Sequence, residues 1–306
     1  MSNSNGVIEI ENLVRGYSKT DAVNGLTLSV SSGRCYGFFG RNGAGKTTTI
    51  KCLLNLLRPQ GGRVRLFGAD PQRENVQIKS RVAYVPDQIP VYPWMSIHQY
   101  FRFLASFRRH WNKGMEESLL KQFALSGQRK VSQLSRGERV QVALIGALCP
   151  EPELLILDEP TSGLDPLTRR DFIRTIIGTY QETAPEKRTV FLSTHLISEF
   201  EGLIDEFTII DRGKSVLNTS TESARQRYRR IRAQFAEVPP SISDPAIIQS
   251  RTEGRELELT ISDRVEEVRQ RLAQHHPIGL EEESLTLEEI FLVNARNEEE
   301  EHVIKN

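Results

Sequence analysis

The chain has 306 residues, and its forty Lys and Arg are balanced by forty Asp and Glu, so the net charge is zero. A protein that mainly binds nucleic acid normally carries a basic surplus, so direct nucleic-acid binding is not expected. The hydrophobic fraction of 38% and the charged fraction of 26% are typical of folded globular proteins rather than disordered chains. The length suggests about two domains.

Neither a membrane span nor a disulfide framework is expected. No apolar run approaches the roughly 18 residues that a membrane-spanning helix needs. The polar segment 1–6 lacks the cationic and apolar regions of a signal peptide. Cys35, Cys52 and Cys149 are too widely spaced for a disulfide framework or a metal cluster. We therefore predict a cytoplasmic chain with reduced thiols.

Strand-like and helix-like segments alternate over the first two hundred or so residues. Short apolar runs at 35–39, 154–157, 189–192 and 207–210 are each bounded by polar or turn residues, as expected for buried strands. Strands that alternate with helical patterns predict an α/β fold with a mostly parallel core sheet.

Two regions differ from this alternation. Helical patterns dominate from about 87 to 150 and begin at capping boxes at Ser96 and Ser135, which indicates a helical insert within a domain spanning 1–215. From 216 to 306, arginine-rich, strand-like and helical patterns predict a small α+β domain that ends in a frayed acidic tail.

A glycine-rich segment after the first apolar run predicts a phosphate-binding loop. It matches G-x-x-x-x-G-K-[ST], with a strand pattern before it and a helical pattern after it. Its glycines allow backbone N–H groups to wrap around phosphate oxygens, and Lys46 supplies a positive charge for the β- and γ-phosphates. The Thr47 hydroxyl is the expected Mg²⁺ ligand. The predicted nucleotide-binding residues here are Gly40, Arg41, Asn42, Gly43, Ala44, Gly45, Lys46, Thr47 and Thr48.

Two carboxylates directly follow the apolar run 154–157. A buried strand places Asp158 at its carboxyl end, where ligands of open α/β sheets bind. We expect Asp158 to hold Mg²⁺ and Glu159 to orient or deprotonate the attacking water. The sequence thus predicts ATP and Mg²⁺ as ligands.

Further motifs carry a resemblance to the ABC (ATP-binding cassette) ATPases. Residues 134–138, Leu-Ser-Arg-Gly-Glu, resemble the LSGGQ signature of that family and lie just upstream of the two carboxylates. Residues 162–165 look like its D-loop, His195 like its switch histidine, and Tyr17 like its adenine-stacking aromatic residue. The motifs occur in the family's order over roughly 7–215 and imply a P-loop ABC ATPase core with an antiparallel N-terminal β portion.

The resemblance also implies roles for these residues. Ser135 and Gly137 would face the nucleotide held by a second ATPase subunit, identical or paralogous, so that ATP lies at a head-to-tail dimer interface. Asp165 of the D-loop would lie at the same nucleotide, and His195 would contact its γ-phosphate.

The sequence departs from the family pattern at three positions. Arg136 stands where glycine is usual, and Glu138 where glutamine is usual. The family also expects a glutamine after the strand pattern 82–85, about where Asp87 stands, with Gln88 adjacent. Either residue could reach Mg²⁺ and the water, and on chemical grounds we favour Gln88.

The C-terminal part resembles the bacterial ABC-2-type exporter ATPase subunits through its arginine-rich segment and residues 285–291. Their membrane subunits are usually separate chains, so the resemblance implies a separate transmembrane permease and a peripheral location on the inner face of the membrane. Tyr92, Trp94 and Phe101 are candidate permease contacts, although we expect Phe101 to be core.

Other functional classes stay open at this point. The chain could be a soluble ABC ATPase without a transporter, for example in cofactor assembly, or a regulatory module that binds nucleotide without turnover. Arginines within 225–232 could contact RNA or lipid headgroups, but a solvated or ion-paired face is the commoner arrangement. His275 and His276 lack companion ligands at metal spacing and are interpreted as surface residues.

Overall fold

The computed structural model describes residues 6–17, 20–181 and 186–304, with side chains described for 6–17, 20–178 and 186–295. Two compact units are present, one formed by Met1–Leu196 with Gly202–Asn218 and the other by Ile197–Glu201 with Thr219–Asn306. The sequence predicted two domains that are each continuous in the chain, 1–215 and 216–306. In the structure the short segment Ile197–Glu201 groups with the second unit instead of the first.

The first unit is built around a six-stranded sheet in the order β5-β6-β7-β3-β8-β9. The pairings of β3 with β7 and β8, and of β6 with β5 and β7, are parallel. The carboxyl ends of these strands therefore meet at one edge of the sheet, where loops can assemble a site. The strands are β3 (Cys35–Phe39), β5 (Val82–Val85), β6 (Leu154–Asp158), β7 (Thr189–Thr194), β8 (Glu206–Asp211) and β9 (Lys214–Ser220).

A second, antiparallel sheet carries the N-terminal strands in the order β2-β1-β4. These are β1 (Gly6–Tyr17), β2 (Thr20–Ser31) and β4 (Gly61–Leu66). Buried side chains of this sheet, such as Ile8 and Leu26, form one hydrophobic cluster with Ile50 of α1 (Lys46–Leu53) and Ile156 of β6. The antiparallel N-terminal β portion and the parallel core are therefore both present.

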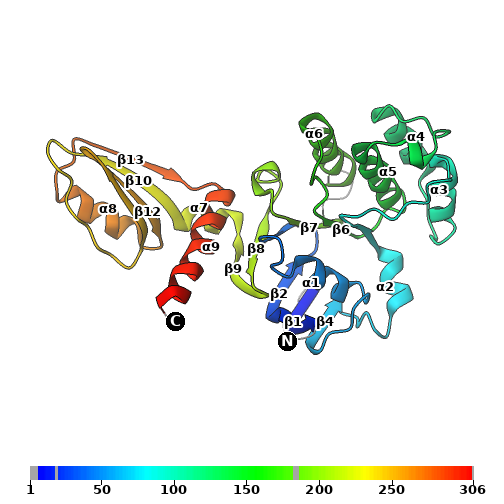
Figure 1. Ribbon diagram of the computed structural model, residues 1–306, viewed down its shortest axis with the longest axis horizontal. Helices are drawn as coiled ribbons and strands as arrows, with labels where there is room; N and C mark the ends of the chain where they lie inside the picture. The colour runs from blue at the N-terminus through cyan, green and yellow to red at the C-terminus, as the bar shows by residue number, and fades with distance from the viewer. Residues whose placement is uncertain (1–5, 18–19, 182–185, 305–306) are drawn as a thin grey trace. The chain divides into compact units, whose positions relative to one another are not determined.

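Helices fill much of the segment between β5 and β6, and Figure 1 shows α3, α4 and α5 gathered together. Both predicted capping boxes form, at Ser96 before α3 and at Ser135 before α5. Phe101 is completely buried, as expected of a core residue. The helices of the first unit beyond α1 are α2 (Asn75–Arg81), α3 (Ile97–Ala105), α4 (Lys113–Gln122), α5 (Arg136–Leu148) and α6 (Pro166–Thr175), with short turns η1 (Val131–Gln133) and η2 (Ile176–Gln181).

The second unit contains a four-stranded antiparallel sheet in the order β11-β12-β10-β13. Apolar side chains of one sheet face, including Ile231 and Leu259, pack with Val268 and Leu272 of α8. The acidic run that was predicted to fray continues α9 as helix. The elements are η3 (Ile197–Glu199), α7 (Thr221–Arg227), β10 (Tyr228–Gln234), β11 (Ile247–Glu253), β12 (Glu256–Ser262), α8 (Val265–Ala273), β13 (Gly279–Ser284) and α9 (Leu287–Ile304).

The arginine-rich segment is ion-paired in the structure. It spans the end of α7 and most of β10 rather than one strand. Arg230 lies 2.8 Å from Glu289 and 3.1 Å from Glu283, and Arg232 lies 2.8 Å from Glu258. These carboxylates neutralise the arginines locally, which removes the main reason to expect RNA or lipid binding.

The described residues include no helix whose length and hydropathy would suit a membrane crossing. Cys35, Cys52 and Cys149 are free and buried. Burial raises the pKa of each of these thiols, so they are poor nucleophiles at neutral pH. His275 and His276 are exposed, as expected for surface residues.

Candidate functional site

The glycine-rich loop joins the end of β3 to α1, which begins at Lys46. Gly43 and Gly45 have φ values of 85° and 109°, which side chains rarely tolerate. A Cβ atom on Gly45 would lie 2.3 Å from the carbonyl oxygen of Ala22, whereas a Cβ on Gly43 would meet no atom within 4 Å. The loop therefore needs glycine at position 45 for both conformation and space.

Lys46 lies folded back over this loop and is almost completely buried. Its ammonium group donates to the carbonyl oxygens of Gly40 (2.6 Å) and Arg41 (3.2 Å). The same group lies 2.9 Å from Oε1 of Glu159. A positive charge is thus fixed between the loop and the carboxylate that follows β6.

Asp158 is fully buried at the carboxyl end of β6. It accepts hydrogen bonds from the hydroxyls of Thr47 (2.9 Å, to Oδ2) and Ser193 (2.9 Å, to Oδ1). Burial raises the pKa of this carboxyl above its ordinary value, and the two hydroxyl donors only partly offset that effect. Burial and the charge of Asp158 in turn raise the pKa of the neighbouring Tyr84 hydroxyl.

Glu159 adopts a left-handed conformation with φ 48°, which is uncommon for a residue with a side chain and often marks a functional turn. Its Oε2 lies 2.8 Å from Nδ1 of His195 and accepts from the Thr194 hydroxyl at 3.3 Å. With Oε1 beside Lys46, the carboxylate connects the phosphate-loop cation to the predicted switch histidine. Lysine, glutamate and histidine from three separate loops therefore converge.

A cavity of about 340 Å³ opens at this point. Both Asp87 and Gln88 are exposed, but only Asp87 is among the residues that line the cavity. Asp87 therefore borders this cavity and Gln88 does not, while the role of either residue toward Mg²⁺ and the attacking water stays a prediction. The lining residues are Ala22, Asn42, Gly43, Gly45, Lys46, Thr47, Thr48, Asp87 and Glu159.

The donors in and beside this cavity fit a magnesium–nucleotide complex. The Thr47 hydroxyl and the Asp158 carboxylate are hard oxygen ligands already within 2.9 Å of each other, which suits Mg²⁺. No cluster of three or more His, Cys, Asp and Glu able to hold a metal occurs among the described residues.

The other predicted contacts do not line this cavity. The Ser135 hydroxyl caps α5 by accepting from Glu138 N–H, and the Glu138 carboxylate accepts from Ser135 N–H at 2.8 Å. Asp165 caps α6 by accepting from the backbone of Leu167 and Thr168. These groups lie at helix starts, together with Gly137 in the first turn of α5.

Tyr17, at the end of β1, is 47% exposed and stands apart from the cavity lining. The guanidinium of Arg15 lies over its ring, 5.4 Å from the centroid. A ring that is accessible and already stacks with a planar cation has the chemistry to stack on an aromatic base.

Sequence reasoning missed Ser193 and Tyr84, which both lie beside Asp158. Ser193 belongs to β7, and Asp158 pairs with Ser193 in the parallel register. The sequence signal for this pair was that Asp158 and Ser193 each directly follow an apolar run. That signal does not reveal which strands are neighbours in the sheet.

Comparisons with known proteins agree with this geometry. A family model described as ABC transporter matches residues 23–162. A bacitracin transport ATP-binding protein from Enterococcus faecalis is 36% identical over 227 residues, covering 73% of this chain and 72% of that protein. A daunorubicin/doxorubicin resistance ATP-binding protein from Streptomyces peucetius is 32% identical over 273 residues, covering 80% of each chain.

A solved structure, described as a dimeric post-hydrolysis state of the ATP-binding cassette MJ0796 bound to ADP and Pi, has the same fold. It matches with a TM-score of 0.61 and 21% identity, over 70% of this chain and 98% of that one. With the fold, the phosphate loop and the paired carboxylates, these likenesses establish that the chain belongs to the ATP-binding, ATP-hydrolysing subunits of ABC transporters.

Proposed function

We propose that this chain hydrolyses Mg²⁺–ATP to drive a separate transmembrane permease in an export direction. The observation that carries the proposal is the convergence of Lys46, Thr47, Asp158 and Glu159 at one cavity. The resistance function named for the Streptomyces relative and the exporter-like C-terminal sequence support export.

Each of these residues has a defined task in that reaction. Lys46 and the loop N–H groups bind the phosphates, and Thr47 with Asp158 would hold Mg²⁺, which neutralises charge on the phosphate oxygens when bound. Phosphates compete with Glu159 for Lys46. When Lys46 turns to the phosphates, Oε1 of Glu159 becomes able to accept a proton from water, while His195 holds Oε2.

Hydrolysis would take place at the interface between two ATPase subunits. In that arrangement Ser135, Gly137 and Asp165 of one subunit would lie at the nucleotide held by the other. Ser135 and Asp165 are exposed and Gly137 is partly exposed at the starts of α5 and α6, and helix N-termini favour anions. The dimeric form of the MJ0796 cassette is consistent with such an arrangement. The second subunit would be another copy of this chain or a paralogue.

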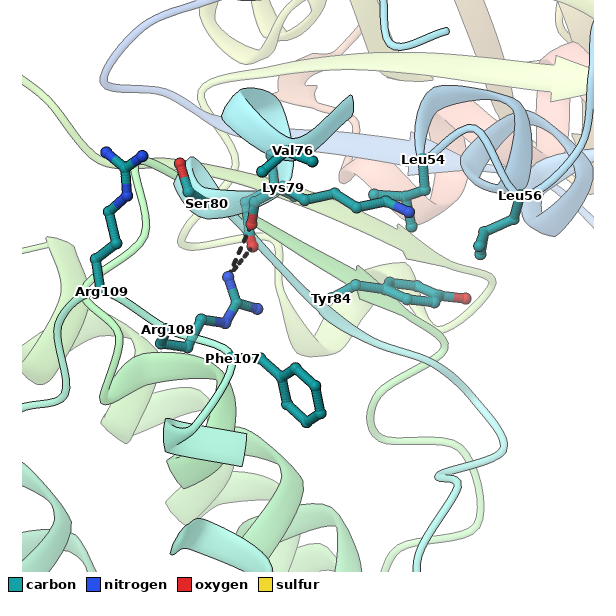
Figure 2. Close-up of a pocket in the computed structure, with 10 residues that line it drawn as sticks. Leu54, Leu56, Val76, Lys79, Ser80, Tyr84, Phe107, Arg108 and Arg109 are labelled. Carbon is teal, nitrogen blue, oxygen red and sulfur yellow. Dashed lines mark hydrogen bonds between the residues drawn. The ribbon is translucent and has the colours of Figure 1, made fainter. Parts of the chain in front are cut away.

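An apolar groove of about 520 Å³ is the proposed docking site for the permease (Figure 2). Val76 and Phe107 line it and are 83% and 73% exposed. Arg108 donates from Nη1 to the carbonyl oxygens of Lys79 (2.8 Å) and Val82 (3.0 Å), which joins the helical insert to α2 and β5. A partner seated here would therefore touch both parts of the first unit.

Aromatic side chains extend the groove along the helical insert. The ring centroids of Phe107 and Phe103 lie 5.1 Å apart, those of Phe103 and Tyr92 5.3 Å, and those of Tyr92 and Trp94 5.2 Å. Lys79 and Arg109 add positive charge at the groove. The matching occupant is a short cytoplasmic segment of the permease with apolar and acidic side chains.

Steady-state phosphate release by the wild type and the Glu159→Gln variant tests the hydrolysis. We expect turnover to fall by roughly 10²–10⁴-fold, the usual contribution of a general base. Size-exclusion runs with Mg²⁺–ATP should show the variant as a stable dimer. A wild type that binds ATP but releases no phosphate would instead support the regulatory module.

Membrane recovery tests the transporter role. The chain is co-expressed with a candidate transmembrane permease from the same genome, and Phe107→Glu is compared with wild type and with Phe235→Leu, a buried control in the second unit. We expect only Phe107→Glu to lose recovery in the membrane pellet while keeping its isolated ATPase rate. Recovery of no variant, wild type included, would favour a soluble ABC ATPase.

A further inference from the structure

Two of the positions that depart from the family pattern contact each other. Nη2 of Arg136, in the signature-like segment, lies 3.5 Å from Oδ1 of Asp87, which stands at about the position where the family expects glutamine. The Arg136 and Asp87 side chains are 58% and 45% exposed. The pair therefore joins the start of α5 to the loop after β5.

The location of Asp87 makes its charge consequential. Asp87 and Glu159 both line the cavity that holds Lys46 and the loop N–H groups. A wall carboxylate repels triphosphate oxygens unless a cation offsets its charge, because like charges repel. A glutamine at this position would carry no such charge, and the side-chain cation that contacts Asp87 in the structure is Arg136.

Arg136 is held where it can provide that cation. Besides its contact with Asp87, its guanidinium lies against Gly163, where an added Cβ would approach Nη1 to 3.0 Å. Gly163 has φ 68°, which keeps the backbone turned beside the arginine. The guanidinium thus lies between the Asp87 loop and the segment after Glu159.

We infer that Arg136 is a positioning residue that neutralises Asp87 and thereby sets the charge of the cavity wall for the nucleotide phosphates. This inference rests on the proposed function, since it concerns the same nucleotide. The Asp87 carboxylate, paired with Arg136, stays at the wall without repelling the phosphates. The positive charge of Arg136 at one departure from the family pattern therefore offsets the negative charge of Asp87 at the other.

A double-mutant cycle tests the inference on the full chain. Affinities for Mg²⁺–ATP and Mg²⁺–ADP are measured by fluorescence titration for wild type, Arg136→Gln, Asp87→Asn and the double variant. We expect Arg136→Gln to weaken ATP binding about three- to tenfold, as for one unpaired, partly solvated charge. The loss should be smaller for ADP and should shrink in high salt.

Rescue separates this role from a general structural one. Asp87→Asn in the Arg136→Gln background should restore ATP affinity to within about twofold of wild type, because coupled sites are not additive. Arg136→Lys should keep most of the affinity. Arg102→Gln, which removes an exposed arginine of α3, is the matched control and should change nothing.

Two results would overturn the inference: an Arg136→Gln variant with unchanged ATP affinity, or a loss that Asp87→Asn does not restore. In the second case Arg136 would act on something other than Asp87. A wild type that binds no ATP would instead contradict the proposed function, so the two failures are distinguishable.

Discussion

The cavity of the first unit and the charged sheet face of the second use similar residues in opposite ways. At the cavity, Lys46 and Asp158 are nearly or completely buried and are positioned by loops that follow different strands. On the sheet of the second unit, Arg230 and Arg232 face Glu258 and Glu283 across neighbouring strands and keep partial access to water.

The difference shows that burial and pairing decide whether a charged group can still bind a ligand. A buried carboxylate such as Asp158 has a raised pKa and therefore an unfavourable charged form, which a cation can relieve. Arg230 and Arg232 already have their counter-ions. Arg230 donates to Glu289 and Glu283, which raises its pKa despite desolvation, and Arg232 donates to Glu258, which raises its pKa. The charged groups of the cavity can still bind a charged ligand. Those of the sheet face are already paired with each other within the fold.

Among the variants that test this comparison, the largest effect is expected from Lys46→Met. The variant removes a charge that contacts both the phosphate loop and Glu159, so turnover should fall by roughly 10²–10³-fold, as for other lost electrostatic contacts to developing charge. Phosphate release checks the rate, and circular dichroism checks that the fold is retained. Turnover near the wild-type level would contradict the assignment of the phosphate loop.

A smaller loss of turnover, with a gain in stability, is expected from Asp158→Asn. Loss of the carboxylate that we propose to hold Mg²⁺ should lower Mg²⁺-dependent turnover by about 10- to 100-fold. Folding raises the pKa of Asp158 above the ordinary value that it has in the unfolded chain. As the pH rises from that ordinary pKa through the raised one, the carboxyl increasingly destabilises the folded state. The variant should therefore melt higher than wild type at neutral pH.

The stability difference should disappear below the ordinary pKa of Asp158, where the carboxyl is protonated in both the folded and unfolded states. Melting curves across the acid range provide this check. A variant that is less stable than wild type at neutral pH would mean that the hydrogen bonds from Thr47 and Ser193 outweigh the cost of burial.

An intermediate effect on stability is expected from Gly45→Ala. Both Gly43 and Gly45 have positive φ, so alanine at either position costs about 1 kcal/mol in conformational energy. Only at Gly45 does the new Cβ also meet a backbone oxygen, at 2.3 Å. Thermal melting should therefore show a clearly larger loss for Gly45→Ala than for Gly43→Ala, and equal losses would argue against the loop geometry.

The smallest effect is expected on the charged sheet face. Arg230 is 20% exposed and contacts three carboxylates, whereas Arg251 is 73% exposed and pairs with Glu253 alone. After allowing for solvent screening, Arg230→Gln should cost about 1 kcal/mol of stability and Arg251→Gln should have no measurable effect. Hydrogen exchange of β10 amides gives the stability, and neither variant should alter ATP turnover.

Local patterns in the sequence predicted much of this molecule. The capping boxes at Ser96 and Ser135 form because they depend on residues three apart in one helix turn. The phosphate loop and the carboxylates after β6 were likewise readable, since each is a contiguous segment with its own conformational requirements.

Other features depended on which segments lie side by side. That Asp87 borders the cavity and Gln88 does not depends on the path of the loop after β5, because one position along a chain changes which side chain lines a cavity. The arginines of β10 were predicted only as a face that is commonly ion-paired. Their partners became known from the antiparallel registers with β12 and β13.

The sequence by itself determined the chemistry of this protein: a loop for phosphates, oxygen ligands for a hard cation and a carboxylate for water. These properties belong to residue types and short spacings. Tertiary structure alone decided that Lys46, Glu159 and His195 meet, that Ser193 supports Asp158, and that Arg136 reaches Asp87. Such contacts join residues distant in the chain, and they are fixed only when the strands take their order and the loops close over their ends.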